Sequence, residues 1–154
     1  MKQTRRTALQ VAGGVGAYAA LVSIGLFRPG QANAFEVSGA FKTQGVAATL
    51  KALGVEGAAE SADVVINAPD IAENGAVVPV GVSSRIPNTE SIALLVEKNP
   101  NALAGTYDVS GIEPQINMRI KMGQSSDVVA IVKADGKYYM AKKEIKVTLG
   151  GCGG

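Results

Sequence analysis

The chain has 154 residues, enough for one ordinary domain and not comfortably for two. It is 47% hydrophobic but only 5% aromatic, and it contains no His and one Cys, so neither a dedicated zinc, copper or haem site nor a Ser-His or Cys-His catalytic pair is expected. The formal net charge of +2 depends on the first 34 residues, because the remainder has 11 basic and 13 acidic side chains. A nucleic-acid-binding surface, which needs a basic patch with interleaved aromatic side chains, is therefore not expected.

Residues 1–34 have the organisation of an export signal. Arg5 and Arg6 precede an apolar run over residues 8–27, and the segment ends in Ala-Asn-Ala, the small-x-small form of a signal cleavage site. We expect cleavage between Ala34 and Phe35. The paired arginines resemble a twin-arginine signal, which exports folded proteins. An uncleaved membrane anchor is the alternative, although four glycines in the run make it a weak one.

A protein is exported in the folded state when a cofactor must be inserted first, or when a partner without its own signal must travel with it. The chain has no evident cofactor ligands, so we expect no cofactor and favour the partner. After cleavage, no membrane attachment is expected.

The mature chain opens with a helical pattern and then changes period. Val46, Leu50 and Leu53 are spaced as on one face of a helix, which Gly54 closes. From Asp63 onward, apolar residues alternate with polar ones, as in half-buried strands. The strand-like runs are DVVINA, AVVPVGVSS, SIALLVE, ALAGTYDV, QINMRIKM, DVVAIVKA and KYYMAKKEIKVTL.

Turn signals separate these runs. Asn74-Gly75 and Asp135-Gly136 are both typical of tight hairpin turns. The pattern predicts a mainly β fold for residues 35–149: an immunoglobulin-like β-sandwich of about seven strands with one short N-terminal helix. Such a fold carries no chemistry by default. The lysines of the last run, Lys142, Lys143 and Lys146, are interpreted as a solvated strand face, with a docking role as the alternative.

Residues 150–154 form a separate tail, Gly-Gly-Cys-Gly-Gly. Gly150, Gly151, Gly153 and Gly154 predict a flexible arm with little bulk around the thiol of Cys152. A catalytic thiol needs the opposite, a rigid electropositive pocket that lowers its pKa. The tail therefore indicates a thiol that carries something into a narrow cleft of another protein.

Other uses of the thiol remain open at this point. A lone thiol in an exported protein can form an intermolecular disulfide. Ubiquitin-like sulfur carriers also end in Gly-Gly, but they need ATP and have more helix. Disulfide exchange is awkward with no second cysteine in the chain.

A twin-arginine-like leader, a β-rich domain and the C-terminal VTLGGCGG together resemble the SoxY family, the sulfur-carrier subunits of the periplasmic thiosulfate-oxidising system. The resemblance also covers the stretches AFKTQGVAATLKALG and PDIAENGAVVPV. It implies a periplasmic, non-catalytic carrier that holds thiosulfate-derived intermediates covalently on Cys152.

The resemblance further implies partners. A SoxZ-like subunit would complete a heterodimer, and transient docking would occur with a haem-containing SoxAX-like enzyme, a SoxB-like hydrolase and a SoxCD-like sulfur dehydrogenase. The competing hypothesis is an exported structural or adhesive β-sandwich whose cysteine forms an intermolecular disulfide.

Overall fold

The structure, a computed structural model, describes residue 37 and residues 39–148. The predicted signal (1–34), its cleavage junction at Ala34–Phe35 and the predicted arm (150–154) lie outside the described residues. Arg5, Arg6, Cys152 and the four tail glycines are therefore not placed.

The described chain begins with a short helical segment. A 3-10 helix, η1 (Ala40–Lys42), precedes the α-helix α2 (Val46–Ala52), which confirms the helix expected from the spacing of apolar residues. The hydroxyl of Thr49 is buried and is satisfied locally, since it donates to the Gly45 carbonyl at 2.8 Å. The chain leaves the helix at Gly54, whose positive φ of 69° is a conformation that glycine adopts without strain.

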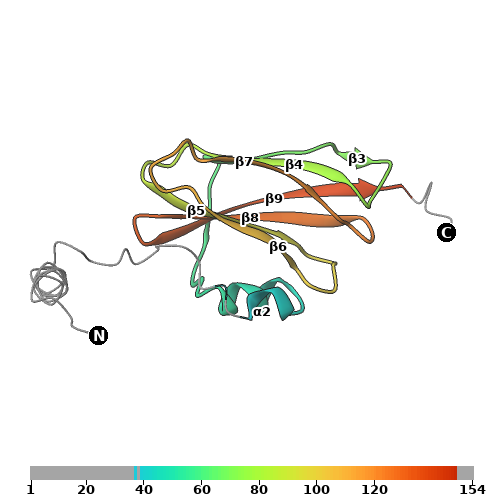
Figure 1. Ribbon diagram of the computed structural model, residues 1–154, viewed down its shortest axis with the longest axis horizontal. Helices are drawn as coiled ribbons and strands as arrows, with labels where there is room; N and C mark the ends of the chain where they lie inside the picture. The colour runs from blue at the N-terminus through green and yellow to red at the C-terminus, as the bar shows by residue number, and fades with distance from the viewer. Residues whose placement is uncertain (1–36, 38, 149–154) are drawn as a thin grey trace, which may run out of the picture. The chain divides into compact units, whose positions relative to one another are not determined.

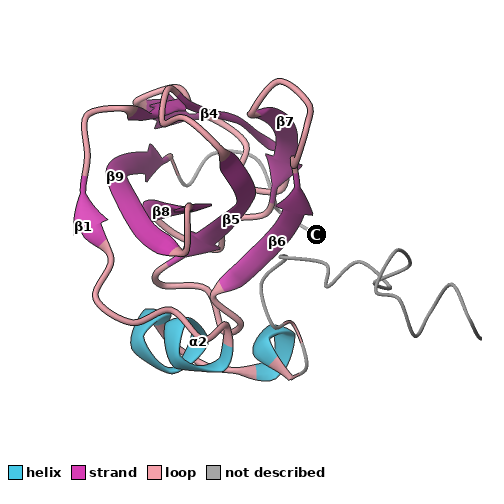
Figure 2. Cartoon of the chain, turned by 90° about the vertical axis from the view of Figure 1, so that its left-hand side faces the viewer, coloured by secondary structure: helices cyan, strands magenta, loops and turns pink. Residues whose placement is uncertain are grey.

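Two β-sheets follow, which confirms the mainly β prediction. The larger sheet has the order β1-β9-β8-β5-β6, with β3 also paired to β9, and the smaller has the order β2-β4-β7. Figure 2 shows the smaller sheet, the larger sheet and the helical segment as three successive layers. The strands are β1 (Ala59–Glu60), β2 (Val64–Asn67), β3 (Ile71–Ala72), β4 (Val78–Ser84), β5 (Thr89–Val96), β6 (Leu103–Asp108), β7 (Gln115–Ile120), β8 (Ser126–Ala134) and β9 (Lys137–Val147).

The larger sheet is buried on both faces near its centre. On β5, Ile92 and Leu94 face the smaller sheet, and Ala93 and Leu95 face the helical segment. All four side chains are fully buried. This two-sided burial explains why β5 reads as a nearly continuous apolar run, whereas β7, at the edge of the smaller sheet, alternates.

The strand prediction was correct for the longer strands and incomplete for the short ones. Seven strands have four or more residues, and the two unexpected ones, β1 and β3, have two residues each. Both pair with β9 in parallel. A two-residue strand is too short to show a period, so its pairing partner is fixed only by the assembled sheet.

The two turn signals have different outcomes. Asp135 and Gly136 both have positive φ (49° and 71°) and join β8 to β9 in a two-residue hairpin, as predicted. The hairpin expected at Asn74-Gly75 is wrong, because β3 and β4 lie in different sheets. Asn74 instead closes a local turn by accepting the Ala76 N–H at its side-chain oxygen, 2.9 Å away.

The lysines of β9 divide between two environments. Lys142 and Lys146 are exposed, as expected for a solvated face. Lys143 is half-buried and forms an ion pair with Asp70, with 3.0 Å between Nζ and the carboxylate oxygen. The reason is the strand period of two residues, which turns Lys143 to the opposite face from its neighbours. Across residues 37 and 39–148, no helix is long and apolar enough to cross a membrane.

Candidate functional site

The predicted arm follows the end of β9, so the described part of the site is the base of the arm. Figure 1 shows this end of β9 beside β3, at the opposite end of the strand from the β8–β9 hairpin. Thr148 is the last described residue, and its backbone N–H donates to the Ala72 carbonyl at 3.0 Å. The Lys146 N–H donates to the Asp70 carbonyl at 2.9 Å. The chain at and just before β3 therefore holds one edge of β9 by backbone hydrogen bonds just before the tail.

Ser125 holds the other edge of β9 by side-chain hydrogen bonds. Its hydroxyl oxygen accepts the Val147 N–H at 2.9 Å, and the hydroxyl lies 3.4 Å from the Val147 carbonyl oxygen, to which it donates. These bonds continue the β8–β9 ladder one step beyond its last register pair, Ser126 with Ile145. The backbone of Val147 is thus held by a side chain where strand β8 no longer provides a partner.

Gly75 completes the base of the arm. Its backbone carbonyl accepts the Met122 N–H at 2.7 Å. A Cβ at this position would clash with the Met122 carbonyl oxygen and lie 2.9 Å from Val147 Cγ1. Gly75 has no positive φ, so it is required here for close approach and not for turn geometry.

We define the arm base as Val147 and Thr148 with the residues that hold them: Ala72, Gly75 and Ser125. Sequence reasoning did not find these three residues. Asn74-Gly75 indicates a turn, but nothing in the sequence indicates that Gly75 lies against Val147. Ala72 and Ser125 act through one backbone carbonyl and one hydroxyl, which leave no recognisable motif.

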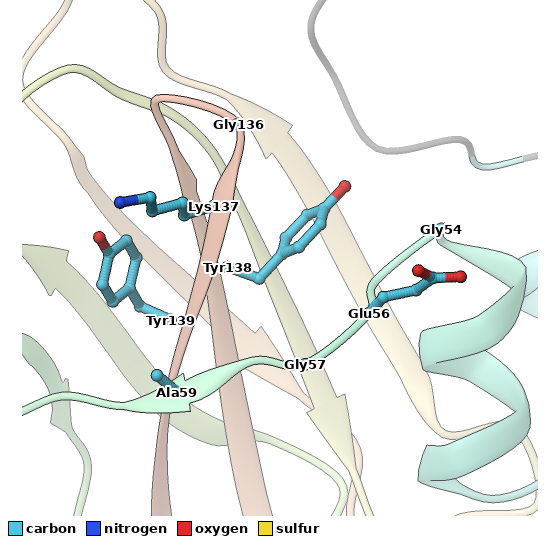
Figure 3. Close-up of a pocket in the computed structure, with 8 residues that line it drawn as sticks. All are labelled: Gly54, Glu56, Gly57, Ala59, Gly136, Lys137, Tyr138 and Tyr139. Carbon is cyan, nitrogen blue, oxygen red and sulfur yellow. The ribbon is translucent and has the colours of Figure 1, made fainter.

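One cavity among the described residues lies far from the arm base. It has a volume of about 430 Å³ and is lined by the segment after α2 and by the start of β9: Gly54, Glu56, Gly57, Ala59, Gly136, Lys137, Tyr138 and Tyr139. Figure 3 shows Tyr138 and Tyr139 on opposite sides of β9, as the strand period predicts. Glu56 stands on the side of Tyr138.

This cavity is out of reach of the chain's own thiol. Lys137 and Val147 are ten residues apart on one strand, which corresponds to about 33 Å. The five residues from Val147 to Cys152 span at most about 17 Å when fully extended. The cavity therefore lies farther from the end of β9 than the five residues after Val147 could span.

No group of three or more His, Cys, Asp or Glu side chains that could hold a metal ion occurs among the described residues. The pKa of Asp108 lies below its ordinary value because the Ser110 backbone N–H, and then the Ser110 hydroxyl, hydrogen-bond its carboxylate. Asp108 ends β6 and is fully exposed, so this effect belongs to a local turn at the surface.

A family model for the sulfur oxidation protein SoxY matches residues 50–152. The chain belongs to the SoxY family. The match covers every strand of the sandwich and runs through the arm base to Cys152, so it includes the tail as far as the cysteine.

A solved structure supports the same assignment. The sulfur carrier protein SoxY from Chlorobium limicola f thiosulfatophilum is 36% identical, with a TM-score of 0.61, over 67% of this chain and 94% of that chain. An engineered protein aligns with a TM-score of only 0.40 and 14% identity over 57% of this chain and 21% of that chain, a likeness too weak to bear on the assignment. No curated protein matches the chain. Membership of the SoxY family places this chain in sulfur oxidation.

Proposed function

We propose that the chain is a sulfur carrier of thiosulfate oxidation, which holds its cargo covalently on Cys152 and catalyses no step itself. The observation that carries the proposal is the family match, which runs through the arm base to Cys152. The 36% identical relative is described as a sulfur carrier protein. An anchored base with a glycine-flanked thiol a few residues beyond it suits a group that several enzymes must reach.

The loading step that we propose joins the Cys152 sulfur to the outer sulfur of thiosulfate. One S–S bond forms, the thiol proton goes to water, and two electrons pass to a haem-containing SoxAX-like enzyme. Water then cleaves the bond between the outer two sulfurs on a SoxB-like hydrolase, which releases sulfate and leaves a persulfide on the cysteine. A SoxCD-like dehydrogenase takes six electrons from that remaining sulfur while three water molecules supply its oxygens and their protons go to solvent, which leaves an S-sulfonate on the cysteine. Hydrolysis of this S-sulfonate releases a second sulfate and frees the thiol.

The proposed setting is the periplasm. Export would use the twin-arginine pair, cleavage would fall between Ala34 and Phe35, and a SoxZ-like subunit would travel with the folded chain as a heterodimer. N-terminal sequencing of periplasmic protein tests the cleavage site. Replacing Arg5 and Arg6 by Lys should block export, and undiminished export of this variant would exclude the twin-arginine route.

The deciding experiment is intact-mass analysis of the mature protein from thiosulfate-oxidising cells, with Cys152→Ser as the comparison. We expect sulfur-containing adducts that a thiol reductant removes, and complete loss of thiosulfate oxidation in the variant. Its thermal midpoint should stay close to that of the wild type, because the substitution lies beyond the packed sandwich. An unmodified cysteine together with full activity of Cys152→Ser would refute the proposal.

The same measurement tests the adhesive or structural alternative, which requires an intermolecular disulfide at Cys152. That hypothesis predicts dimers of twice the subunit mass that a reductant separates, with no added sulfur or oxygen. It gives no reason for the match to a family of sulfur oxidation proteins.

The glycines of the arm have their own test. Replacing Gly150 and Gly151 by Val adds bulk and restricts the backbone, so transfer between enzymes should slow. The SoxZ-like heterodimer should survive on size-exclusion chromatography. Equal turnover would show that the glycines do not serve access to the enzymes.

A further inference from the structure

Two of the large apolar side chains exposed on the described chain lie beside the arm base. Ile71 is 57% exposed and Val77 is 49% exposed. Ile71 immediately precedes Ala72, whose carbonyl holds Thr148. Val77 closes the turn that begins at Asn74, since its N–H donates to the Asn74 carbonyl at 3.3 Å. The backbone within this turn, at Gly75, lies against Val147.

Single exposed apolar side chains are common on protein surfaces and need no explanation by themselves. The position of these two is different, because both belong to one short stretch, residues 71–77, which pairs with and packs against the end of β9. Figure 1 shows β3 beside the C-terminal end of β9. We call Ile71 and Val77 the collar.

The length of the tail limits how far an enzyme that receives the thiol can be from the collar. Because Thr148 is held by Ala72, the reach of the thiol is counted from Thr148. Cys152 lies four residues further on, and fully extended backbone covers about 14 Å in that length. Any enzyme that receives the thiol inside a cleft must therefore bring the rim of that cleft to within a few ångströms of the arm base.

We propose that the collar is the docking surface for the enzymes that load and unload Cys152, and that each of them presents an apolar rim around the mouth of its cleft. The inference rests on the carrier function proposed above and adds the surface that the enzymes recognise. Burying two half-exposed aliphatic side chains would supply affinity without any contact to the cargo. One carrier can then serve several enzymes, since the recognised surface stays the same while the group on the sulfur changes.

The test is Ile71→Ser combined with Val77→Ser, in the mature chain with its partner subunit, assayed with the purified haem enzyme, thiosulfate and an electron acceptor. We expect kcat/KM for the carrier to fall about tenfold, with kcat at saturating carrier unchanged, because the lost contacts are made before the chemistry. The matched control is Ile112→Ser. Ile112 is 66% exposed and follows β6 in the loop to β7, close to the hairpin end of the sandwich and away from the arm base. This control should leave kcat/KM unchanged.

A second measurement separates this inference from the carrier function itself. Carrier with Cys152→Ser and an intact collar should inhibit the loading of wild-type carrier competitively, and adding Ile71→Ser and Val77→Ser should raise the inhibition constant about tenfold. If the collar variants are loaded as fast as the wild type and inhibit as strongly, while Cys152→Ser is inactive, the docking role of the collar is refuted and the carrier function stands. If Cys152→Ser still supports thiosulfate oxidation, the carrier function fails.

Two further outcomes would also overturn the collar. Loss of the heterodimer in the double Ser variant, seen by size-exclusion chromatography, would assign Ile71 and Val77 to the subunit interface. An equal fall in kcat/KM for Ile112→Ser would show that any exposed apolar residue has the same effect. Circular dichroism of the variants checks that they fold, and the single substitutions replace the double one if it does not.

Discussion

Gly75 is the residue on which the close packing of the arm base depends, and Gly75→Ala tests this directly. The added Cβ would lie 2.9 Å from Val147 Cγ1 and would clash with the carbonyl oxygen of Met122. The neighbour that clashes is backbone, and the same two residues are joined by the 2.7 Å bond from the Met122 N–H to the Gly75 carbonyl. Relief of the clash must therefore stretch that bond or displace the end of β9.

Overpacking of this kind costs about 2 kcal/mol, within a range of about 1–3 kcal/mol. For a domain of this size, a loss of 1 kcal/mol lowers the thermal midpoint by about 4 °C, so Gly75→Ala should lower it by about 8 °C. Urea denaturation of the mature chain measures the same loss as a lower midpoint with an unchanged slope. Hydrogen exchange of the Val147 and Thr148 amides should also accelerate, because the displacement is local to the arm base.

The matched control is Gly123→Ala. Gly123 follows Met122, has no atom within 4 Å of the position a Cβ would take, and has no positive φ. Its substitution should change the free energy of unfolding by less than about 0.5 kcal/mol. Wild-type stability of Gly75→Ala, or equal destabilisation by Gly123→Ala, would refute the assignment of Gly75 to close packing.

Three further substitutions test other parts of the structure. Ser125→Ala removes the acceptor of the Val147 N–H, so the protection of that amide from exchange should fall about five- to tenfold; unchanged protection would show that the bond does not hold β9. Ile145→Ala removes a fully buried core side chain and should cost about 2–5 kcal/mol in urea denaturation, and a loss below about 1 kcal/mol would contradict its place in the core. Ser91→Ala should be neutral or slightly stabilising in the same assay, because its buried hydroxyl oxygen has no hydrogen-bond partner among the described residues; a loss above about 1 kcal/mol would reveal a partner.

The parts of the fold that could be predicted are those fixed by neighbours in the sequence. The helix α2, the alternation along β7 and the Asp135-Gly136 hairpin each follow from a local period or a two-residue turn. The parts that could not be predicted depend on distant partners. Asn74-Gly75 is an example. A dipeptide of this type forms a hairpin only when the two strands beside it pair with each other, and β3 pairs with β9 instead of β4.

The candidate site divides in the same way. Cys152 and its glycines stay a sequence prediction, and that prediction depends only on residues next to one another in the sequence. The arm base and the collar are defined by tertiary contacts: Ala72 and Ser125 reach β9 from positions about 75 and 22 residues away in the sequence. Contacts between residues so far apart in the sequence produce no pattern that could be recognised in a single sequence.

The parallel pairing of β3 with β9 also has a consequence for the order of folding. Ile71 and Lys146 are register partners about 75 residues apart. Their pairing closes a loop of that length, but the ladder that it forms has only two residue pairs. A contact that closes a long loop costs chain entropy, and two residue pairs return little stabilisation. We therefore expect β3 to pair with β9 late in folding, after the β8–β9 hairpin and the smaller sheet have formed. A chain that has not finished folding therefore has no fixed base for its thiol and no collar beside it. If the enzymes dock on the collar, as proposed above, they would recognise only chains in which β3 has already paired with β9.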